Sequence, residues 1–341
     1  KQTTLGYGYG GTSNLWHGVL GLLDSEDWDC FEKKLGSEKL RSDVERGLPH
    51  LTDYFDKGIG FLRDGTEHIA TQMSPLLDTS RLEPKKYLVQ LWPTRFREKI
   101  KAAKRRYPDR LTLFTNAIAI KLNVDELGSI KSITVATDRG PENICADVFV
   151  ASLGALESPR LLKQSFLGDS FDNKLTGKGL MDHPHVIIGE LVSQKKIFYR
   201  QHAVNSIFSK TSNRIGFTVP AEERKSRMLN HSIIVRPSFG VDEATSRAAL
   251  KAIVQGGKLA KLVSNFARDS TFRRAIAILA CEKFGIGVYT NRFLVSLQLE
   301  QLQDDRGRVE LSKDVEKFGR NIPKVTRYFS RELIEDLSNM K

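Results

Sequence analysis

The stretch that most constrains the fold runs from Ala146 to Ser165. Ala146–Ala151 is rich in apolar residues and reads as a buried strand, and a short turn containing Gly154 follows it. Ala155–Ser165 has the apolar spacing of a helix, with Pro159 in its first turn, where a missing N–H group costs little. A strand that passes through a tight turn into a helix is typical of nucleotide-binding α/β sheets, which bind ligands beyond the carboxyl end of the strand. We therefore expect a ligand beside this turn.

Local patterns predict further helices and strands before Ala146. Apolar residues at helical spacing indicate helices, alternation indicates strands, and the Pro-punctuated residues 50–93 look irregular. We also expect Ser132–Thr137 to pair with Val148–Ala151 across a turn at Arg139–Pro141. The other predicted elements here are helices over Asp24–Lys33 and Arg95–Tyr107 and strands over Leu111–Thr115 and Ala117–Leu122.

The pattern changes after a boundary that we place near Asp182–Pro184. Several stretches alternate with a period of two, as expected for an antiparallel sheet with one wet face. Between two of them, Thr245–Cys281 predicts a pair of basic amphipathic helices. The remaining predicted elements are strands over His185–Val192, Arg214–Val219, His231–Arg236 and Tyr289–Leu302, a turn at Asp314–Arg320 and a helix over Tyr328–Met340.

The opening of the chain, Gly8–Gly18, is rich in glycine (GYGGTSNLWHG). Glycine adopts positive φ easily and lets backbone N–H groups approach a ligand closely. Consecutive N–H groups, together with the hydroxyl groups of Thr12 and Ser13, form a nest suited to a pyrophosphate or to the polar edge of a flavin. Spacing alone does not separate such a nest from a glycine-rich turn that binds nothing.

Five blocks give this loop a context. They are Gly10–Gly18 continued by Leu23–Trp28, Pro93–Phe96 through Asn116–Ile120, Ala146–Leu162, Gly177–Pro184, and Glu300–Gly319. Taken in order, the blocks resemble the signatures of the glucose–methanol–choline (GMC) family of flavin-dependent oxidoreductases. Each block is a modest match, but together they span nearly the whole chain with sensible gaps.

The resemblance implies a bound FAD cofactor that is not attached covalently. Some members of the family bind the flavin through a histidine at the position that Leu15 occupies here, and leucine cannot form that bond. The positions implied to contact FAD are Gly10, Gly11, Thr12 and Ser13 in the loop, Leu15, Trp16 and His17 near the isoalloxazine ring, the backbone of Ile118, Ala119 and Ile120 at the adenine, Ser152, Gly154 and Ala155 at the adenosine or pyrophosphate, and Asp182 with His183.

Two parts that alcohol oxidation by a flavoprotein of this family would need are not found in this chain. Oxidation of an alcohol requires a base within hydrogen-bond reach of the hydroxyl group, and we identify no catalytic residue of this kind. His183 is expected to be close to the flavin in a structural role, with direct catalysis the less favoured alternative. The G-x-G-x-x-G fingerprint of dinucleotide-binding folds is also missing. We expect an incomplete portion of a longer protein; the alternative is a truncated homologue without activity.

The expected fold class is α/β, or α+β overall. An incomplete, Rossmann-like FAD-binding domain would be interleaved with a substrate domain built on an antiparallel sheet. The expected parts are 1–22 with 110–182 for FAD binding, 23–109 as an intermediate or lid segment, 183–312 for the substrate, and 313–341 returning toward the FAD domain.

The resemblance implies oxidation of a CH–OH group of a small alcohol or sugar by hydride transfer to FAD, with the electron acceptor left open. A non-catalytic flavin-binding protein is one alternative. Another is a peripheral membrane dehydrogenase linked to a quinone, attached through the basic helices near Arg247–Lys283, although helices that cover a sheet are more common.

Composition excludes several other classes. The net charge of +12 is concentrated in Lys99–Arg110 and Arg247–Lys283, but these stretches lack interleaved aromatic residues and match no nucleic-acid module. We therefore expect solvated basic helix faces and no nucleic-acid partner. The three cysteines are far apart and are expected to be free thiols, with no metal site. No apolar run approaches the length of a membrane span, and the cellular location is not indicated.

Overall fold

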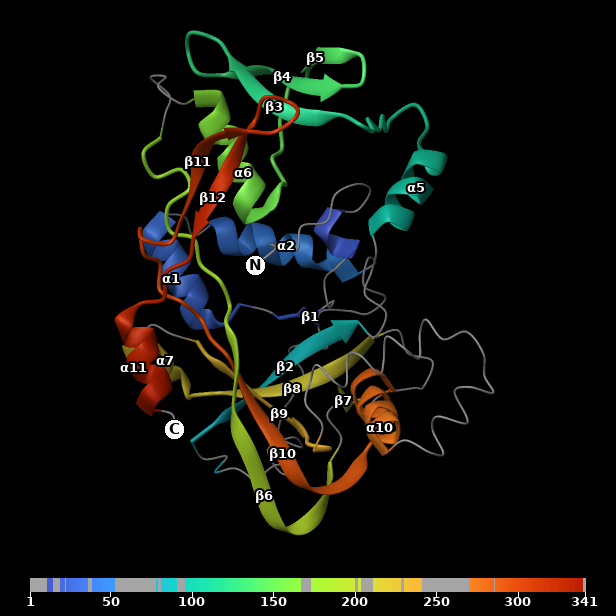
Figure 1. The fold of residues 1–341 in the computed structure, drawn as a ribbon, viewed down its shortest axis with the longest axis vertical. Helices are drawn as coiled ribbons and strands as arrows, with labels where there is room; N and C mark the ends of the chain where they lie inside the picture. Colours follow the sequence, from blue (N-terminus) through green and yellow to red (C-terminus); the bar gives the residue numbers. More distant parts are fainter. Residues whose placement is uncertain are drawn as a thin grey trace. The chain divides into compact units, whose positions relative to one another are not determined.

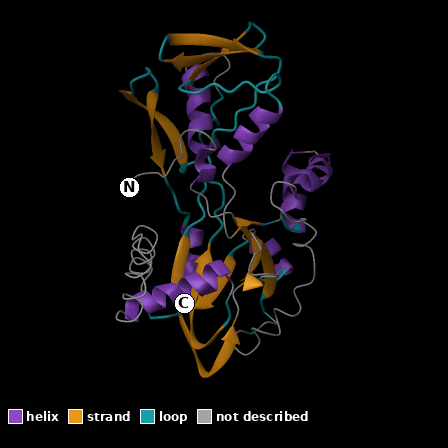
Figure 2. Cartoon of the chain, turned by 90° about the vertical axis from the view of Figure 1, so that its right-hand side faces the viewer, coloured by secondary structure: helices purple, strands orange, loops and turns teal. Residues whose placement is uncertain are grey.

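The computed structural model describes residues 11–14, 19–21, 23–35, 39–52, 78, 81–90, 96–166, 173–199, 202–203, 211–227, 230–240, 270–284 and 286–339. The chain forms two compact units, each of helices and antiparallel sheets (Figure 1 and Figure 2). Unit 1 is Lys1–Lys101 with Pro184–Leu299, and unit 2 is Ala102–His183 with Glu300–Lys341.

The seven-stranded sheet of unit 1 is antiparallel throughout and has the order β1-β2-β8-β9-β10-β6, with β7 paired to β8. The four strands predicted from alternation after His185 are present, although β10 ends at Gln298 rather than at Leu302. The strands are β1 (Val19–Leu20), β2 (Glu83–Gln90), β6 (His185–Tyr199), β7 (His202–Ala203), β8 (Thr211–Thr218), β9 (Ser232–Pro237) and β10 (Val288–Gln298).

β1 connects the glycine-rich opening to this sheet, because Val19 lies opposite Val89 of β2. The sequence groups residues 1–22 with 110–182, whereas the contacts group them with the sheet of unit 1. β2 lies in the stretch that was interpreted as irregular. Its Pro84 and two lysines obscure an alternation that the pairing with β8 reveals.

The core cluster of unit 1 contains side chains from β6, β8, β9 and β10. Phe217, Val235 and Phe293 are at most 1% exposed, and Tyr199 is 5% exposed. The rings of Tyr199 and Phe293 meet edge to face with centroids 5.4 Å apart, a geometry that aromatic pairs prefer. The Tyr199 hydroxyl donates to the Val235 carbonyl at 2.6 Å, so this buried polar group is satisfied.

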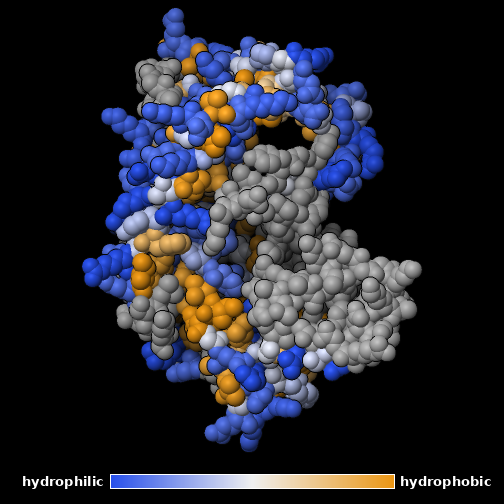
Figure 3. Space-filling view, viewed as in Figure 1, coloured by the Kyte–Doolittle hydropathy of each residue, from blue (hydrophilic) through white to orange (hydrophobic). Residues whose placement is uncertain are grey.

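The edge strand β6 is more exposed than the strands inside the sheet. Figure 3 shows apolar side chains gathered over β6 and β10. The exposed apolar residues of these strands include Ile187, Val192 and Tyr289, the last with 73% of its surface accessible. An exposed apolar patch of this kind commonly marks a surface that binds a ligand or a partner.

The helices of unit 1 include the one predicted over Asp24–Lys33. Asp24 precedes it, and the Asp24 N–H group donates to the Asp27 carboxylate at 2.9 Å, which is the reciprocal half of a capping box. For the predicted pair of basic helices, residues 241–269 lie outside the described residues. The described helices are α1 (Ser25–Leu35), α2 (Lys39–Thr52), α7 (Ala221–Arg227) and α10 (Ser270–Phe284). The helix predicted over Arg95–Tyr107 is present as α5 (Phe96–Arg106), and it leads from unit 1 into unit 2.

Among the described residues, unit 2 contains two small antiparallel sheets, two helices of its own and the end of α5. One sheet has the order β3-β4-β5 and the other pairs β11 with β12 around the predicted turn. The helix predicted at Ala155–Ser165 and the final helix are both present. The elements are β3 (Ile118–Val124), β4 (Ile130–Thr137), β5 (Gly140–Cys145), α6 (Gly154–Phe166), β11 (Arg308–Val315), β12 (Asn321–Thr326) and α11 (Arg331–Asn339).

The strand predicted over Ala146–Ala151 is wrong. β4 pairs with Gly140–Cys145 instead of Val148–Ala151, and residues 146–153 belong to no strand. Val148 is 76% exposed and Val150 is 81% exposed. The apolar pattern indicates burial between neighbouring strands, but no such neighbour lies beside it among the described residues.

The strand predicted over Leu111–Thr115 is also absent, and Phe114 within it is 60% exposed. Two described lengths of chain therefore carry strand-like sequence without strand pairing. Among the helices that the structure describes, none is long and apolar enough to cross a membrane.

Candidate functional site

Two blocks that are distant in the sequence lie side by side in unit 2. The Gly177 carbonyl accepts a hydrogen bond from the Val309 N–H group at 2.7 Å, and the Leu180 N–H group donates to the Gly307 carbonyl at 2.8 Å. We call this pairing of residues 177–183 with 301–309 the clip. It brings the fourth and fifth of the quoted blocks together directly before Asp182.

The clip requires glycine at its closest contacts. A Cβ atom at Gly177 would lie 2.3 Å from the Val309 carbonyl oxygen, and one at Gly307 would lie 2.5 Å from the Leu180 carbonyl oxygen. Gly177 also has a positive φ of 81°, which non-glycine residues rarely adopt. These glycines therefore let the two backbones approach each other closely.

Asp182 is fixed at the end of the clip through its backbone and its carboxylate. Its N–H group donates to Gln301 Oε1 at 2.6 Å, while Gln301 Nε2 donates to the Tyr328 carbonyl at 3.0 Å. The Asp182 carboxylate accepts from the His183 N–H group at 2.9 Å and lies 3.5 Å from Arg327. These contacts hold the main chain of His183, whereas the residue itself remains exposed.

The turn before α6 leaves backbone open to a ligand. Ser152, Gly154 and Ala155 are all exposed, and Gly154 has a positive φ of 79°. A Cβ atom at Gly154 would meet nothing within 4 Å. Helix N-termini attract anions because their first N–H groups have no partner within the helix, so the arrangement suits a phosphate group.

Glu157 in the first turn of α6 would oppose an anion, but two arginines neutralise it. Arg160 and Arg320 lie 3.2 Å and 3.3 Å from its carboxylate. The Arg160 side chain is 4% exposed, donates to the Asn321 carbonyl at 2.8 Å and lies 3.2 Å from Glu316. This ion cluster attaches α6 to the β11–β12 hairpin and leaves the open turn without a net repelling charge nearby.

Ile118, Ala119 and Ile120 lie on β3, an edge strand of its sheet. The β3–β4 register slips between Ala119 and Lys121, so Ile120 is an extra residue without a ladder partner. Such bulges often occur next to functional sites. Farther along β3, the Leu122 N–H group donates to Ser165 near the end of α6, which lies at the opposite end of this helix from Gly154.

The glycine-rich loop is described only in part. Gly11–Asn14 forms a short 3-10 helix in which Gly11 has a φ of 51° and Thr12 is exposed. Ser13 lies in the same turn. Gly10, Leu15, Trp16 and His17 lie outside the described residues. Gly11, Thr12 and Ser13 belong to unit 1, while the other described candidate residues belong to unit 2.

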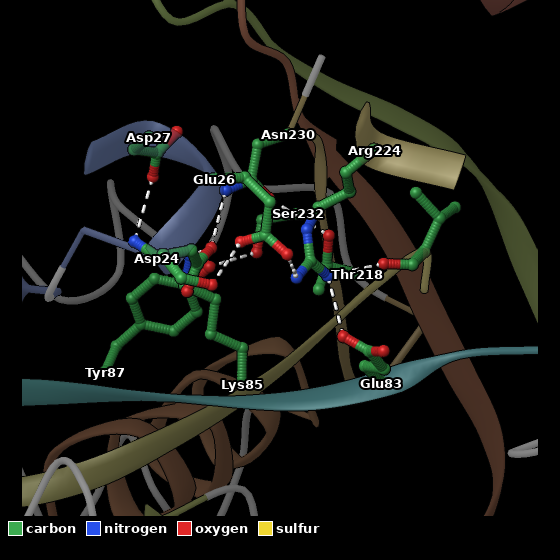
Figure 4. A network of polar contacts seen from close by, with 12 residues as sticks. Asp24, Glu26, Asp27, Glu83, Lys85, Tyr87, Thr218, Arg224, Asn230 and Ser232 are labelled. Carbon is green, nitrogen blue, oxygen red and sulfur yellow. Dashed lines mark hydrogen bonds and ion pairs between the residues drawn. The ribbon is translucent and has the colours of Figure 1, made fainter. Parts of the chain in front are cut away.

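A polar network that the sequence did not suggest lies in unit 1, and Figure 4 shows its side chains pointing toward one another from α1, β2 and α7. Lys85 and Asn230 donate to the Asp24 carboxylate at 2.5 Å and 2.7 Å. Arg224 donates to Glu83 at 2.7 Å and lies 3.4 Å from Glu26. Asp24 therefore contributes backbone to the start of α1 but gives its carboxylate to the sheet.

Tyr87 extends this network through its hydroxyl group, which lies 2.6 Å from the Ser232 hydroxyl group. A Cβ atom at Gly216 would lie 3.0 Å from the Tyr87 ring, and one at Gly21 would lie 3.3 Å from it. The ring is thus packed against two glycines. The contacts that build the network span 61 to 206 residues of sequence, so no local pattern could have indicated it.

The charges of the network reinforce one another. Burial acts to lower the pKa of Arg224, but the hydrogen bond to Glu83 and the charges of Glu83, Asp24 and Glu26 outweigh it and raise the pKa. Burial acts to raise the pKa of Glu26, but its backbone hydrogen bond and the Arg224 charge lower it overall. Arg224 and Glu26 therefore stay ionised at neutral pH, and their ion pair helps to hold α1 on the sheet.

Comparisons with known proteins give no family for this chain: no protein-family model matches it, and no curated protein matches it significantly. Among the described residues, no group of histidine, cysteine and acidic side chains could hold a metal ion. The contacts of Asp182 with Gln301 and Arg327 were not predicted from the sequence. Gln301 lies within a quoted block, but its amide partners are 27 and 119 residues away.

Proposed function

We propose that this chain is part of an FAD-dependent oxidoreductase of the GMC type, which oxidises a CH–OH group of an alcohol or sugar. The observation that most supports the proposal is the clip. Two of the five resembling blocks, Gly177–Pro184 and Glu300–Gly319, lie against each other through backbone hydrogen bonds. A resemblance produced by chance would give no reason for these two blocks to be neighbours.

The residues implied to contact FAD have properties that suit this cofactor. The turn Ser152–Ala155 offers exposed backbone at a helix N-terminus, which suits the pyrophosphate. Ile118–Ile120 lie on an edge strand with a bulge, where main-chain groups can reach the adenine. His183 is exposed on a fixed main chain. When bound, FAD supplies the hydride acceptor, and these residues bind and orient it.

The proposal includes a Rossmann-like FAD-binding domain of which residues 110–182 form a part. The exposed apolar surface over β6 and β10 would then belong to the substrate side.

The test is anaerobic reduction of the flavin in the full-length protein by a panel of alcohols and sugars. We expect the purified protein to be yellow and at least one CH–OH compound to bleach it. A flavin that no member of the panel reduces would favour a non-catalytic flavin-binding protein. A protein that neither contains nor binds FAD would contradict the proposal.

The absence of a covalent link follows from Leu15 and is tested separately. Acid precipitation should leave all flavin in the supernatant, because leucine offers no nucleophile for attachment. Flavin that stays with the precipitated polypeptide would contradict this part of the proposal while leaving the reaction itself in place.

A further inference from the structure

Gln301 joins three lengths of chain at the point where the clip ends. Its side chain accepts from the Asp182 N–H group at 2.6 Å and donates to the Tyr328 carbonyl at 3.0 Å. The residue is 8% exposed. A buried amide that bonds to two distant backbone groups fixes those groups relative to each other. Losing either hydrogen bond would leave a buried polar group unsatisfied, which costs free energy.

Tyr328 and Asp182, the two hydrogen-bond partners of Gln301, make further contacts of their own. The Tyr328 ring lies under the Arg306 guanidinium, which is 3.9 Å from the ring centroid. Arg306 is in turn paired with Asp304 at 2.6 Å. On the other side, Arg327 lies 3.5 Å from the Asp182 carboxylate. The amide of Gln301 therefore connects the Tyr328 backbone, whose ring contacts Arg306, to the Asp182 backbone.

The next residue, His183, shows what this support carries. The His183 N–H group donates to Asp182 Oδ1 at 2.9 Å, so its main chain is fixed through Asp182. The residue is nevertheless exposed. An immobile backbone with an accessible imidazole is the arrangement that a ligand contact needs, since a site residue must be oriented before the ligand arrives.

We propose that Gln301 is a positioning residue that orients His183 for contact with a bound ligand, with Arg327 as its second support. The part of this inference that concerns the flavin rests on the proposed function. The part that concerns the orientation of His183 rests on the contacts of unit 2 alone. Gln301 does not touch the reacting atoms in this proposal and acts through Asp182.

The test compares Gln301→Met with Gln164→Met in the full-length protein. Gln164 is a matched control, because its Oε1 accepts from the Asn321 N–H group at 2.9 Å, also across unit 2 and far along the sequence. Gln301→Met loses two such contacts and Gln164→Met loses one, so both variants should be less stable. Only Gln301→Met should change the ¹³Cε1 resonance of His183, which is assigned by its loss in His183→Gln.

The second measurement is the dissociation constant of FAD. We expect Gln301→Met to raise it about tenfold and Gln164→Met to leave it within about twofold. Equal effects of the two variants on the His183 resonance and on FAD binding would overturn the proposal. If the wild-type protein binds no FAD, the proposed function fails, and the resonance alone decides the role of Gln301.

Arg327→Met keeps the inference testable if Gln301→Met does not fold. The Arg327 side chain is 54% exposed, so its loss should not prevent folding. We expect the His183 resonance to shift in the same direction, by less. Arg331→Met is the control, because Arg331 pairs with the exposed Glu335 of α11. An unchanged His183 resonance in Arg327→Met would contradict the proposed role of Arg327 as a second support.

Discussion

At the scale of single residues, Gly154 combines backbone strain with open space. Its φ of 79° is unfavourable for any side chain, yet a Cβ atom there would meet nothing. Gly319, with a φ of 72°, shares both properties in the β11–β12 turn. Alanine should therefore cost about 1–2 kcal/mol of unfolding free energy at either position.

Comparison of Gly154→Ala with Gly319→Ala tests whether the turn before α6 contacts the cofactor. We expect only Gly154→Ala to weaken FAD binding, by about tenfold, because its methyl group would occupy the open backbone. Isothermal titration of the apoprotein with FAD measures this. Equal FAD affinities in both variants would remove the turn from the proposed site.

Arg224 is the residue on which the polar network of unit 1 depends. It is 8% exposed and is paired with Glu83 and Glu26. Arg224→Met should lower the free energy of unfolding by about 2 kcal/mol, because two carboxylates lose their partner in a half-buried site. Urea titration measures the change. Arg41→Met, which breaks an exposed pair with Glu45, should cost less than about 0.5 kcal/mol, and equal losses would contradict the prediction.

At the scale of elements, sequence patterns predicted what local spacing determines. α5 and α6 follow from their apolar spacing, and β3 follows from its alternation. β2 was missed because its lysines and proline have the composition of a loop. Its inward side chains find partners on other elements, such as Lys85 at Asp24 and Tyr87 at Ser232. The sequence contains no local signal for such contacts.

The candidate site, like the helices and strands, was predicted from the sequence only in part. The turn at Gly154 and the pair Asp182–His183 were named from the sequence, and the structure describes both. The clip that connects the fourth and fifth blocks was not foreseen, because contacts across 119 residues or more leave no trace in local spacing. Glycines at positions such as Gly177 and Gly307 were visible, but only the structure shows which backbone each of them meets.

The segment 146–153 is the element for which pattern and structure disagree most. Val148 and Val150 are exposed, so changing both to serine in the 1–341 chain should alter the free energy of unfolding by less than about 0.5 kcal/mol. Val135→Ser on β4 is the control, because this side chain is 6% exposed and its loss should cost about 2 kcal/mol or more. Chemical denaturation measures both, and a loss for the valine pair as large as for Val135 would show that the segment is buried.

At the scale of the whole molecule, each unit is held by an apolar sheet face or helix contact together with a charged cluster that joins distant segments. In unit 1 the network around Arg224 attaches α1 to the sheet. In unit 2 the cluster around Arg160 attaches α6 to the β11–β12 hairpin. Carboxylates take part in both clusters, so stability should respond to acid in both units.

The pH dependence of stability follows from carboxylates whose pKa is lowered in the folded chain. The side-chain hydrogen bond from Arg306, followed by the Arg306 N–H group, lowers the pKa of Asp304 from 3.8 to about 2. Folding therefore favours the ionised form, so this contribution is present above about pH 4 and is lost as the pH falls toward 2. Glu26, Asp125, Glu190 and Glu332 also have lowered pKa values and add to the same trend. Urea titrations between pH 7 and pH 2 should show unfolding free energy falling below about pH 4.5 in the wild type, with a shallower fall between pH 4 and pH 2 in Asp304→Asn. If the unfolding free energy of the variant falls as steeply as that of the wild type, Asp304 does not contribute. Equal slopes would mean that the wild type takes up no additional proton at Asp304 when it unfolds.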